Sequence, residues 1–203
     1  MKTDLVFPEG NESELIEMAL ALGYEQLVLI YDAPEKVKIL PAGKIKLLYG
    51  VLVADLIGNK LTRKIDQIKG KKFLALVPAG EEEFNRFVLE KTAADILFNL
   101  EYTHKKDHLH YRKSGLDEII CRIAARNGKI IAFSFSSLLE TEKRGLVLGR
   151  MMQNIRFCRK FGVKTFLGSF TAYTEAMRSP FDLQKLAKVL GADEGTAEEI
   201  ILR

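Results

Sequence analysis

Seven short apolar runs alternate with amphipathic stretches, and this alternation constrains the fold more than any other feature of the sequence. The runs predict strands over 4–7, 26–31, 47–54, 73–77, 95–99, 129–133 and 164–168. Periodic apolar positions between them predict helices over 12–22, 59–68, 81–91, 116–126, 142–161 and 180–190. Strands that alternate with helices, and that consist almost continuously of Val, Ile, Leu and Phe, indicate a parallel sheet covered by helices. We therefore predict one α/β domain over residues 1–203.

A parallel sheet of this kind can close into a barrel or stay open. Seven strand–helix units in 203 residues are few for a complete eight-unit barrel. No GxGxxG or Walker-type loop follows any of the runs, which weakens the case for an open nucleotide-binding sheet. The sequence favours an irregular TIM-like barrel of about seven βα units, with an open parallel sheet as the alternative.

Composition places the chain among globular proteins of the cytoplasm. Apolar residues make up 47% and charged residues 29%, both ordinary values for such a protein. No apolar run approaches the roughly 18 residues that a membrane span needs, and the first residues lack the apolar stretch of a signal peptide. Cys121 and Cys158 lie in apolar helical patterns, which predicts two buried thiols and a reducing compartment.

Positive charge gathers in the second half of the chain. Residues 104–203 hold 18 Lys and Arg against 11 Asp and Glu, whereas residues 1–103 hold 13 against 16. Nine of the eleven arginines belong to the second half. The planar guanidinium group of arginine suits phosphate oxygens, so this asymmetry favours nucleic-acid binding. The alternative is a solvated surface without a binding role.

Three histidines, the only ones of the chain, share its least regular segment, residues 101–114. Their spacing could serve a metal site, but such a site needs further ligands from other strand ends. Lys105 and Lys106 would also repel a cation nearby. A solvated loop is therefore the favoured interpretation of His104, His108 and His110.

Serines follow the predicted strand 129–133 closely, where barrel proteins often carry functional loops. A nucleophilic serine needs an adjacent base, and neither a Gly-x-Ser-x-Gly elbow nor a histidine motif accompanies this segment. We expect these side chains to satisfy backbone groups at a strand-to-helix turn. They are Ser134, Ser136 and Ser137.

Two features place arginines where phosphate could bind. On the predicted helix 142–161, the apolar stripe leaves Arg150, Arg156 and Lys160 on the opposite arc, which we expect to face solvent. Arg178 directly precedes Ser-Pro-Phe-Asp at 179–182, a strong signal for a helix start. Helix amino termini bind phosphate readily, so Arg178 and the nearby backbone N–H groups form a candidate anion site.

Four motifs, matching in order and spacing, resemble ribonuclease P protein component 3 of archaeal type. They are Gly115-Leu-Asp-Glu-Ile-Ile-Cys-Arg-Ile-Ala-Ala-Arg-Asn127, Ile131-Ala-Phe-Ser-Phe-Ser-Ser-Leu-Leu139, Arg150-Met-Met-Gln-Asn154 and Met177-Arg-Ser-Pro-Phe-Asp-Leu183. The resemblance spans residues 114–190 and is diffuse over 4–100. The chain departs from the family's usual residues at Glu118, at Ser136-Ser137 and at Phe181.

The resemblance implies a barrel like that of the polymerase-and-histidinol-phosphatase-like metal hydrolases, without their metal ligands. It implies a subunit of the ribonucleoprotein that removes the 5′ leader of precursor tRNA, in which the RNA, with Mg²⁺, performs the hydrolysis. The implied partners are that catalytic RNA, protein component 2, the other protein subunits and, through the complex, precursor tRNA. No membrane and no catalytic residue of the protein's own are expected.

Two rival functions differ from this one in testable ways. A metal-dependent phosphoesterase on the same barrel needs a His-x-His at the end of the first strand, where this chain reads Asp4-Leu-Val-Phe7. A pure assembly scaffold would have no affinity for RNA once its partner is absent.

If the chain binds RNA, the contacts are expected from arginines of its basic half. Arg122 is the least certain, because it can instead pair with Asp117 or Glu118 on the same helix. The predicted RNA-binding residues are Arg122, Arg126, Arg150, Arg156 and Arg178.

Overall fold

Seven parallel strands form the centre of the protein, as the sequence predicts. The computed structural model describes residues 2–41 and 43–192. The strands pair in chain order, each parallel to its neighbours. They are β1 (Thr3–Val6), β2 (Gln26–Tyr31), β3 (Lys46–Leu52), β4 (Leu74–Pro78), β5 (Ile96–Phe98), β6 (Ile130–Ser134) and β7 (Lys164–Gly168).

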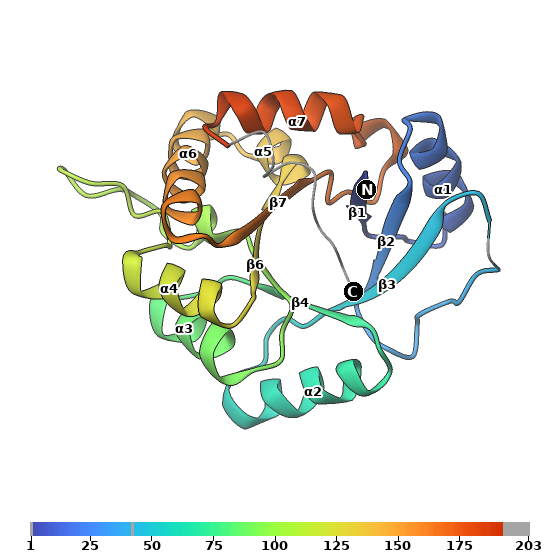
Figure 1. The fold of residues 1–203 in the computed structure, drawn as a ribbon, viewed down its shortest axis with the longest axis horizontal. Coiled ribbons are helices and arrows are strands. Elements are labelled where there is room, and N and C mark those ends of the chain that lie inside the picture. The colour runs from blue at the N-terminus through green and yellow to red at the C-terminus, as the bar shows by residue number, and fades with distance from the viewer. Residues whose placement is uncertain (1, 42, 193–203) are drawn as a thin grey trace.

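Helices surround these strands in a ring (Figure 1). They are α1 (Glu12–Ala21), α2 (Gly58–Gly70), α3 (Glu82–Lys91), α4 (Glu118–Arg126), α5 (Phe135–Glu140), α6 (Arg144–Phe161) and α7 (Pro180–Val189), with 3₁₀ turns η1 (Leu100–Tyr102) and η2 (Thr174–Ala176). None of the described helices is long and apolar enough to cross a membrane.

The ring is irregular in two places, and only the second departs from the sequence prediction. No helix is described between β2 and β3, a connection that carries Pro34 and Pro41. Proline removes a backbone donor and obstructs a helix, so the second of the seven units lacks its helix. Between β6 and β7, the short helix α5 precedes α6, where a single helix was predicted.

Apolar side chains fill two layers, one inside the strands and one between the strands and the helices. On β2, Val28 and Ile30 belong to the inner layer, whereas Leu27 and Leu29 pack outward beneath α1. This alternation follows from the two-residue period of a strand. Because both faces are covered, β2 has to be apolar throughout, as its sequence is.

The ring of strands is closed at one end of the seam between β1 and β7. Beyond the end of β7, the Phe170 N–H donates to the Leu5 carbonyl at 2.8 Å, and the Phe7 N–H donates to the Thr171 carbonyl at 2.9 Å. The buried Asp4 carboxylate accepts from the Ser169 N–H at 2.7 Å. The sheet is therefore a nearly closed TIM-like barrel, and the barrel prediction is confirmed.

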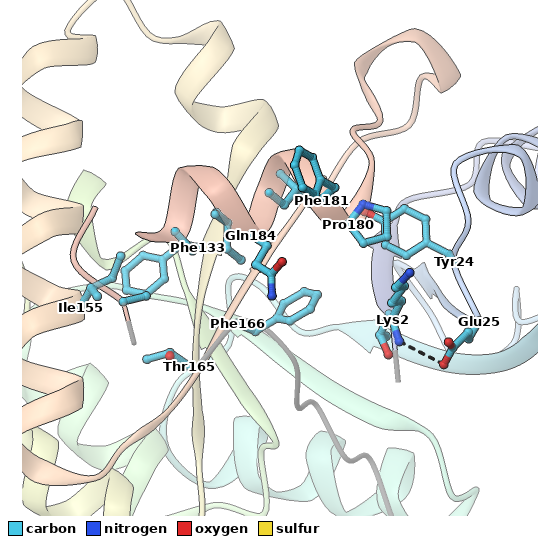
Figure 2. Close-up of a pocket in the computed structure, with 15 residues that line it drawn as sticks. Lys2, Tyr24, Glu25, Phe133, Ile155, Thr165, Phe166, Pro180, Phe181 and Gln184 are labelled. Carbon is cyan, nitrogen blue, oxygen red and sulfur yellow. Dashed lines mark hydrogen bonds between the residues drawn. The ribbon is translucent and has the colours of Figure 1, made fainter. Parts of the chain in front are cut away.

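The amino-terminal end of the same seam holds a pocket of about 370 Å³ under α7. Figure 2 shows Phe166 and Gln184 reaching into it, with Lys2 and Glu25 at its far side. The Lys2 backbone N–H donates to the Glu25 carboxylate at 3.3 Å. Most of the other residues that line it are aromatic or aliphatic. We therefore interpret the pocket as the gap between β1 and β7 and not as a site for an anion.

Gly115 is required where the chain enters α4, and this generates the first prediction. Its φ is +81°, and a Cβ built there would lie 2.5 Å from the Leu100 carbonyl oxygen. Gly115→Ala should lower the free energy of unfolding by at least about 1–2 kcal/mol, because a left-handed alanine is strained and the clash is with backbone.

Urea unfolding measures this effect, with Gly145→Ala as the matched control. Gly145 lies in α6 with nothing within 4 Å of its built Cβ. The control should stay within about 1 kcal/mol of the wild type or be slightly stabilised. Equal stability of the two variants would contradict the account.

Asp4 makes the stability of the barrel depend on pH. Burial raises its pKa from the ordinary 3.8 to about 6, against the opposing effect of hydrogen bonds from Ser169 and Leu5. Between these values the folded chain holds a proton that the unfolded chain releases. The free energy of unfolding therefore falls as pH rises from about 4 through 6.

Asp4→Asn keeps an oxygen that can accept the Ser169 N–H and removes the titration. Between about pH 4.5 and pH 7.5, the variant should lose about 2 kcal/mol less stability than the wild type in urea unfolding. Glu101, whose pKa burial raises to about 7, titrates in both proteins and cancels in the comparison. The same pH dependence in both proteins would refute the role given to Asp4.

Candidate RNA-binding surface

Four of the five predicted arginines lie on two neighbouring helices, α4 and α6, and three of the four are exposed. Helix α4 starts at an Asp117 cap, whose carboxylate accepts from the Ile120 N–H at 2.7 Å. It buries Ile120, Cys121, Ile123 and Ala124 and leaves Arg122 and Arg126, four residues apart, on its exposed side. Arg156 is exposed on α6, which packs against α4. The fold thus brings Arg122, Arg126 and Arg156 to one part of the surface.

A groove of about 500 Å³ runs along α6, and its charged side chains are all basic. It is lined by Arg112, Gly149, Met152, Gln153, Arg156, Phe157 and Lys160. Arg112 comes from the loop before α4 and was not among the predicted residues. Gly149 makes its close approach possible, because a Cβ there would lie only 2.8 Å from the Arg112 Nε. We call this groove, with its three cations, the α6 groove.

A second groove, of about 850 Å³, lies beside the first and shares Lys160 with it. Its other charged residues are Arg86, Glu90, Arg122 and Arg126. The Phe161 ring also lines this groove, and two cations lie near it. The Arg122 Cζ and the Lys160 Nζ are each 5.1 Å from the ring centroid, so the ring brings the two cations close together. We refer to the cations of the two grooves on α4, on α6 and in the preceding loop as the basic face: Arg112, Arg122, Arg126, Arg156 and Lys160.

Arg122 forms the ion pair that the sequence offered as its alternative. Its Nη2 lies 2.7 Å from the Glu118 carboxylate, four residues earlier on α4. The arginine lowers the pKa of Glu118 by hydrogen bonding to the charged form. Both side chains are more than half exposed, so this pair contributes little to stability and competes only weakly with a phosphate.

Arg150 does not face solvent, and its predicted place on an exposed arc is wrong. Its side chain is 1% exposed. The Nε donates to Asp107 at 2.8 Å, and the Nη1 donates to the carbonyls of Glu101 and His104 at 2.8 and 2.7 Å. The segment after η1 covers this arc of α6, so Arg150 binds protein atoms in the position where an RNA contact was predicted.

Arg178 stands apart from the basic face, at the start of α7. Its Nη1 donates to the carbonyls of Glu175 and Met177, and its Cζ lies 5.2 Å from the centroid of the Phe135 ring. The predicted cap is confirmed, because Ser179 accepts from the Asp182 N–H at 3.2 Å. Since the Asp182 carboxylate already occupies this helix end, an anion would meet a negative charge there.

Two of the three serines after β6 serve the backbone, as predicted, whereas the Ser137 hydroxyl donates to the Asn99 side chain at 3.5 Å. Ser134 caps α5 by accepting from the Ser137 N–H at 3.1 Å. Ser136 donates to the Phe170 carbonyl at 2.5 Å and so links the segments that follow β6 and β7. The thiols of Cys121 and Cys158 are fully buried, which is also as predicted.

Aromatic rings gather at the carboxyl end of the barrel, where related architectures place their chemistry. Phe98 ends β5, and its ring stacks on that of Phe170 at 5.3 Å between centroids, while Phe7 lies 6.1 Å from Phe170. The three histidines belong instead to the loop before α4. Among the described residues, no group of three or more His, Cys, Asp or Glu side chains is placed to hold a metal ion.

Known proteins resemble this chain in both sequence and fold. Ribonuclease P protein component 3 of Methanosarcina barkeri is 26% identical over 202 residues, covering 96% of this chain and 81% of the relative. A chain in the cryo-EM structure of archaeal ribonuclease P with mature tRNA superposes with a TM-score of 0.80, at 20% identity, over 98% of this chain and 87% of the other.

The histidinol phosphate phosphatase of Lactococcus lactis, solved with zinc, L-histidinol and phosphate, shares the same barrel. It has a TM-score of 0.64 at 15% identity, over 95% of this chain and 94% of its own. At such identities the structural likeness establishes the fold alone. The sequence of this chain matches the family described as RNase P subunit p30 over residues 2–203, almost its whole length. On this match the protein belongs to the RNase P subunit p30 family.

Proposed function

We propose that this protein is a non-catalytic subunit of ribonuclease P, acting in removal of the 5′ leader of precursor tRNA. The observation that carries the proposal is the family match over residues 2–203. It is supported by the relative in Methanosarcina barkeri, which is named ribonuclease P protein component 3, and by the likeness to a chain of archaeal ribonuclease P.

The physical task that we assign to the protein is neutralisation of RNA phosphates by the basic face. Three cations line the α6 groove without a carboxylate among its lining residues. Within the described part of the chain, Arg126 and Arg156 appear in none of the ion pairs. Binding there would release counterions from the RNA and reduce the repulsion between its helices, which favours the compact active fold.

In this proposal the chemistry belongs to the RNA, which acts with Mg²⁺. The protein partners are component 2 and the other protein subunits, and precursor tRNA is met through the complex. A cytoplasmic location agrees with the two buried, unpaired cysteines. The phenyl rings at the carboxyl end of the barrel offer no ligand for a metal and no acid or base, which argues against the rival phosphoesterase.

Reconstitution tests the proposed function. Cleavage of precursor tRNA by the cognate RNA and its other proteins is measured over a series of Mg²⁺ concentrations, with and without this protein. Its presence should shift activity to lower Mg²⁺, because protein cations replace part of the metal ions that screen the phosphates. A globular protein of similarly basic isoelectric point serves as control. Unchanged cleavage at every Mg²⁺ concentration would contradict the proposal.

Removal of single charges tests which surface carries the binding. Arg126→Ala and Arg156→Ala should each weaken RNA binding independently of sequence and reduce the slope of log K against log salt by about 0.7–0.9. Arg63→Ala, on the exposed side of α2, removes the same charge outside the basic face and should leave the slope unchanged. Equal effects of all three variants would show that only net charge matters.

A further inference from the structure

The loop between η1 and α4 projects away from the barrel beyond α4 and α6 (Figure 1). Two large side chains on it are exposed to an unusual degree, Leu109 by 92% and Tyr111 by 62%. The neutralising role assigned to the basic face does not use these side chains. Exposed apolar and aromatic groups gathered on one projection mark an interaction site.

Two rings stand side by side near the tip of this loop. The centroids of His108 and Tyr111 are 4.4 Å apart, with 32° between the ring planes. The His108 N–H donates to the Tyr111 carbonyl at 3.0 Å, so the backbone closes a tight turn with Leu109 and His110 at its tip. The turn holds the two rings together on an exposed platform.

A buried cation fixes the base of the loop. Arg150, on α6, donates to the carbonyl of His104 and to the carboxylate of Asp107. The same Asp107 oxygen accepts from the Lys113 N–H at 3.0 Å on the returning side of the loop. Gln153 donates to Ser114 at 3.0 Å. The base is thus ordered before any partner arrives, which reduces the entropy lost on binding.

The positive charge of the loop favours a nucleic acid, and not an apolar protein surface, as its partner. Lys105, Lys106 and Arg112 are exposed on it. The only acid between 104 and 113 is Asp107, whose charge is matched by Arg150 at 2.7 Å. Aromatic rings among cations are the usual platform for unpaired bases, because every base has a face that can stack. Arg112 also lines the α6 groove, so this platform continues the basic face.

We propose that the loop 104–113 is a stacking site for an unpaired nucleotide of RNA, whose base stacks upon the adjacent rings of His108 and Tyr111. The proposal rests on the proposed function and adds a preference for unpaired nucleotides, which the basic face alone does not provide. Phosphate contacts are indifferent to whether bases are paired, whereas a stacking platform needs a base that is free.

The sequence contains no tryptophan, so Tyr111→Trp introduces a unique fluorophore at the platform. The probes are an RNA hairpin with an unpaired loop and a fully paired duplex of equal length. The hairpin should quench the tryptophan and the duplex should not. Tyr173→Trp is the matched control, since Tyr173 is 59% exposed on a different segment, and neither RNA should quench it.

Affinity supplies the second readout. Tyr111→Ala should weaken hairpin binding about 5- to 100-fold, the cost of one lost base stack, with little change for the duplex. Tyr111→Phe keeps the ring and should bind as the wild type does. Urea unfolding of each variant confirms that the barrel is intact.

The outcomes separate this proposal from the proposed function. If wild-type protein binds both RNAs with strong salt dependence but Tyr111→Trp is not quenched, or is quenched equally by both, the stacking site is refuted and the basic face stands. If the wild type binds neither RNA, the stacking site and the phosphate-neutralising role of the basic face both fail, whereas the assignment as a ribonuclease P subunit is decided by the reconstitution. If Tyr111→Ala keeps its RNA affinity but loses assembly with component 2, the loop is a protein-docking surface and the stacking proposal is wrong.

Discussion

The buried guanidinium of Arg150 joins the parts of the molecule on which its proposed function depends. It links α6 to η1 through the Glu101 carbonyl and to the following loop through His104 and Asp107. A cation at 1% exposure is costly unless every neighbour compensates it, and breaking such a pair leaves a charge without a partner. By fixing this loop, Arg150 supports the two features that the loop carries. One is Arg112, which lines the α6 groove, and the other is the pair of rings of His108 and Tyr111. Arg150 acts by placing other residues.

Aromatic side chains fill the carboxyl end of the barrel. At the carboxyl end of the strands, Phe170 sits at a positive φ of 50° with its ring stacked on Phe98. A left-handed phenylalanine is strained, and here hydrogen bonds from its N–H to Leu5 and from Ser136 to its carbonyl hold it in place. The same residue closes the seam between β1 and β7. Aromatic packing thus completes the barrel, and the basic surface lies outside it, on the helices.

The elements that the sequence predicted best are those decided by local periodicity. All seven strands and most helices follow from the spacing of apolar residues, and the α7 cap follows from Ser179 and Asp182. Arg150 was misplaced because helical periodicity says which arc a residue occupies and not what covers that arc. Arg112 was missed because its place beside Arg156 depends on the path of a loop and on the missing Cβ of Gly149. Even Arg122 and Arg126, chosen for their charge, become part of a site only through the packing of α4 on α6.

The central claim, that the face formed by α4 and α6 meets the RNA, can be tested most directly by probing from the protein surface. Cys121 and Cys158 are fully buried, so a cysteine introduced at residue 153 in the α6 groove, or at the exposed residue 17 of α1, can carry a tethered iron chelate that generates hydroxyl radicals. Helix α1 lies across the barrel from α4 and α6 (Figure 1). In the assembled complex, we predict localised cleavage of the ribonuclease P RNA from residue 153 and little from residue 17. Cleavage from residue 17 with none from residue 153 would place the RNA on the opposite surface and contradict the central claim.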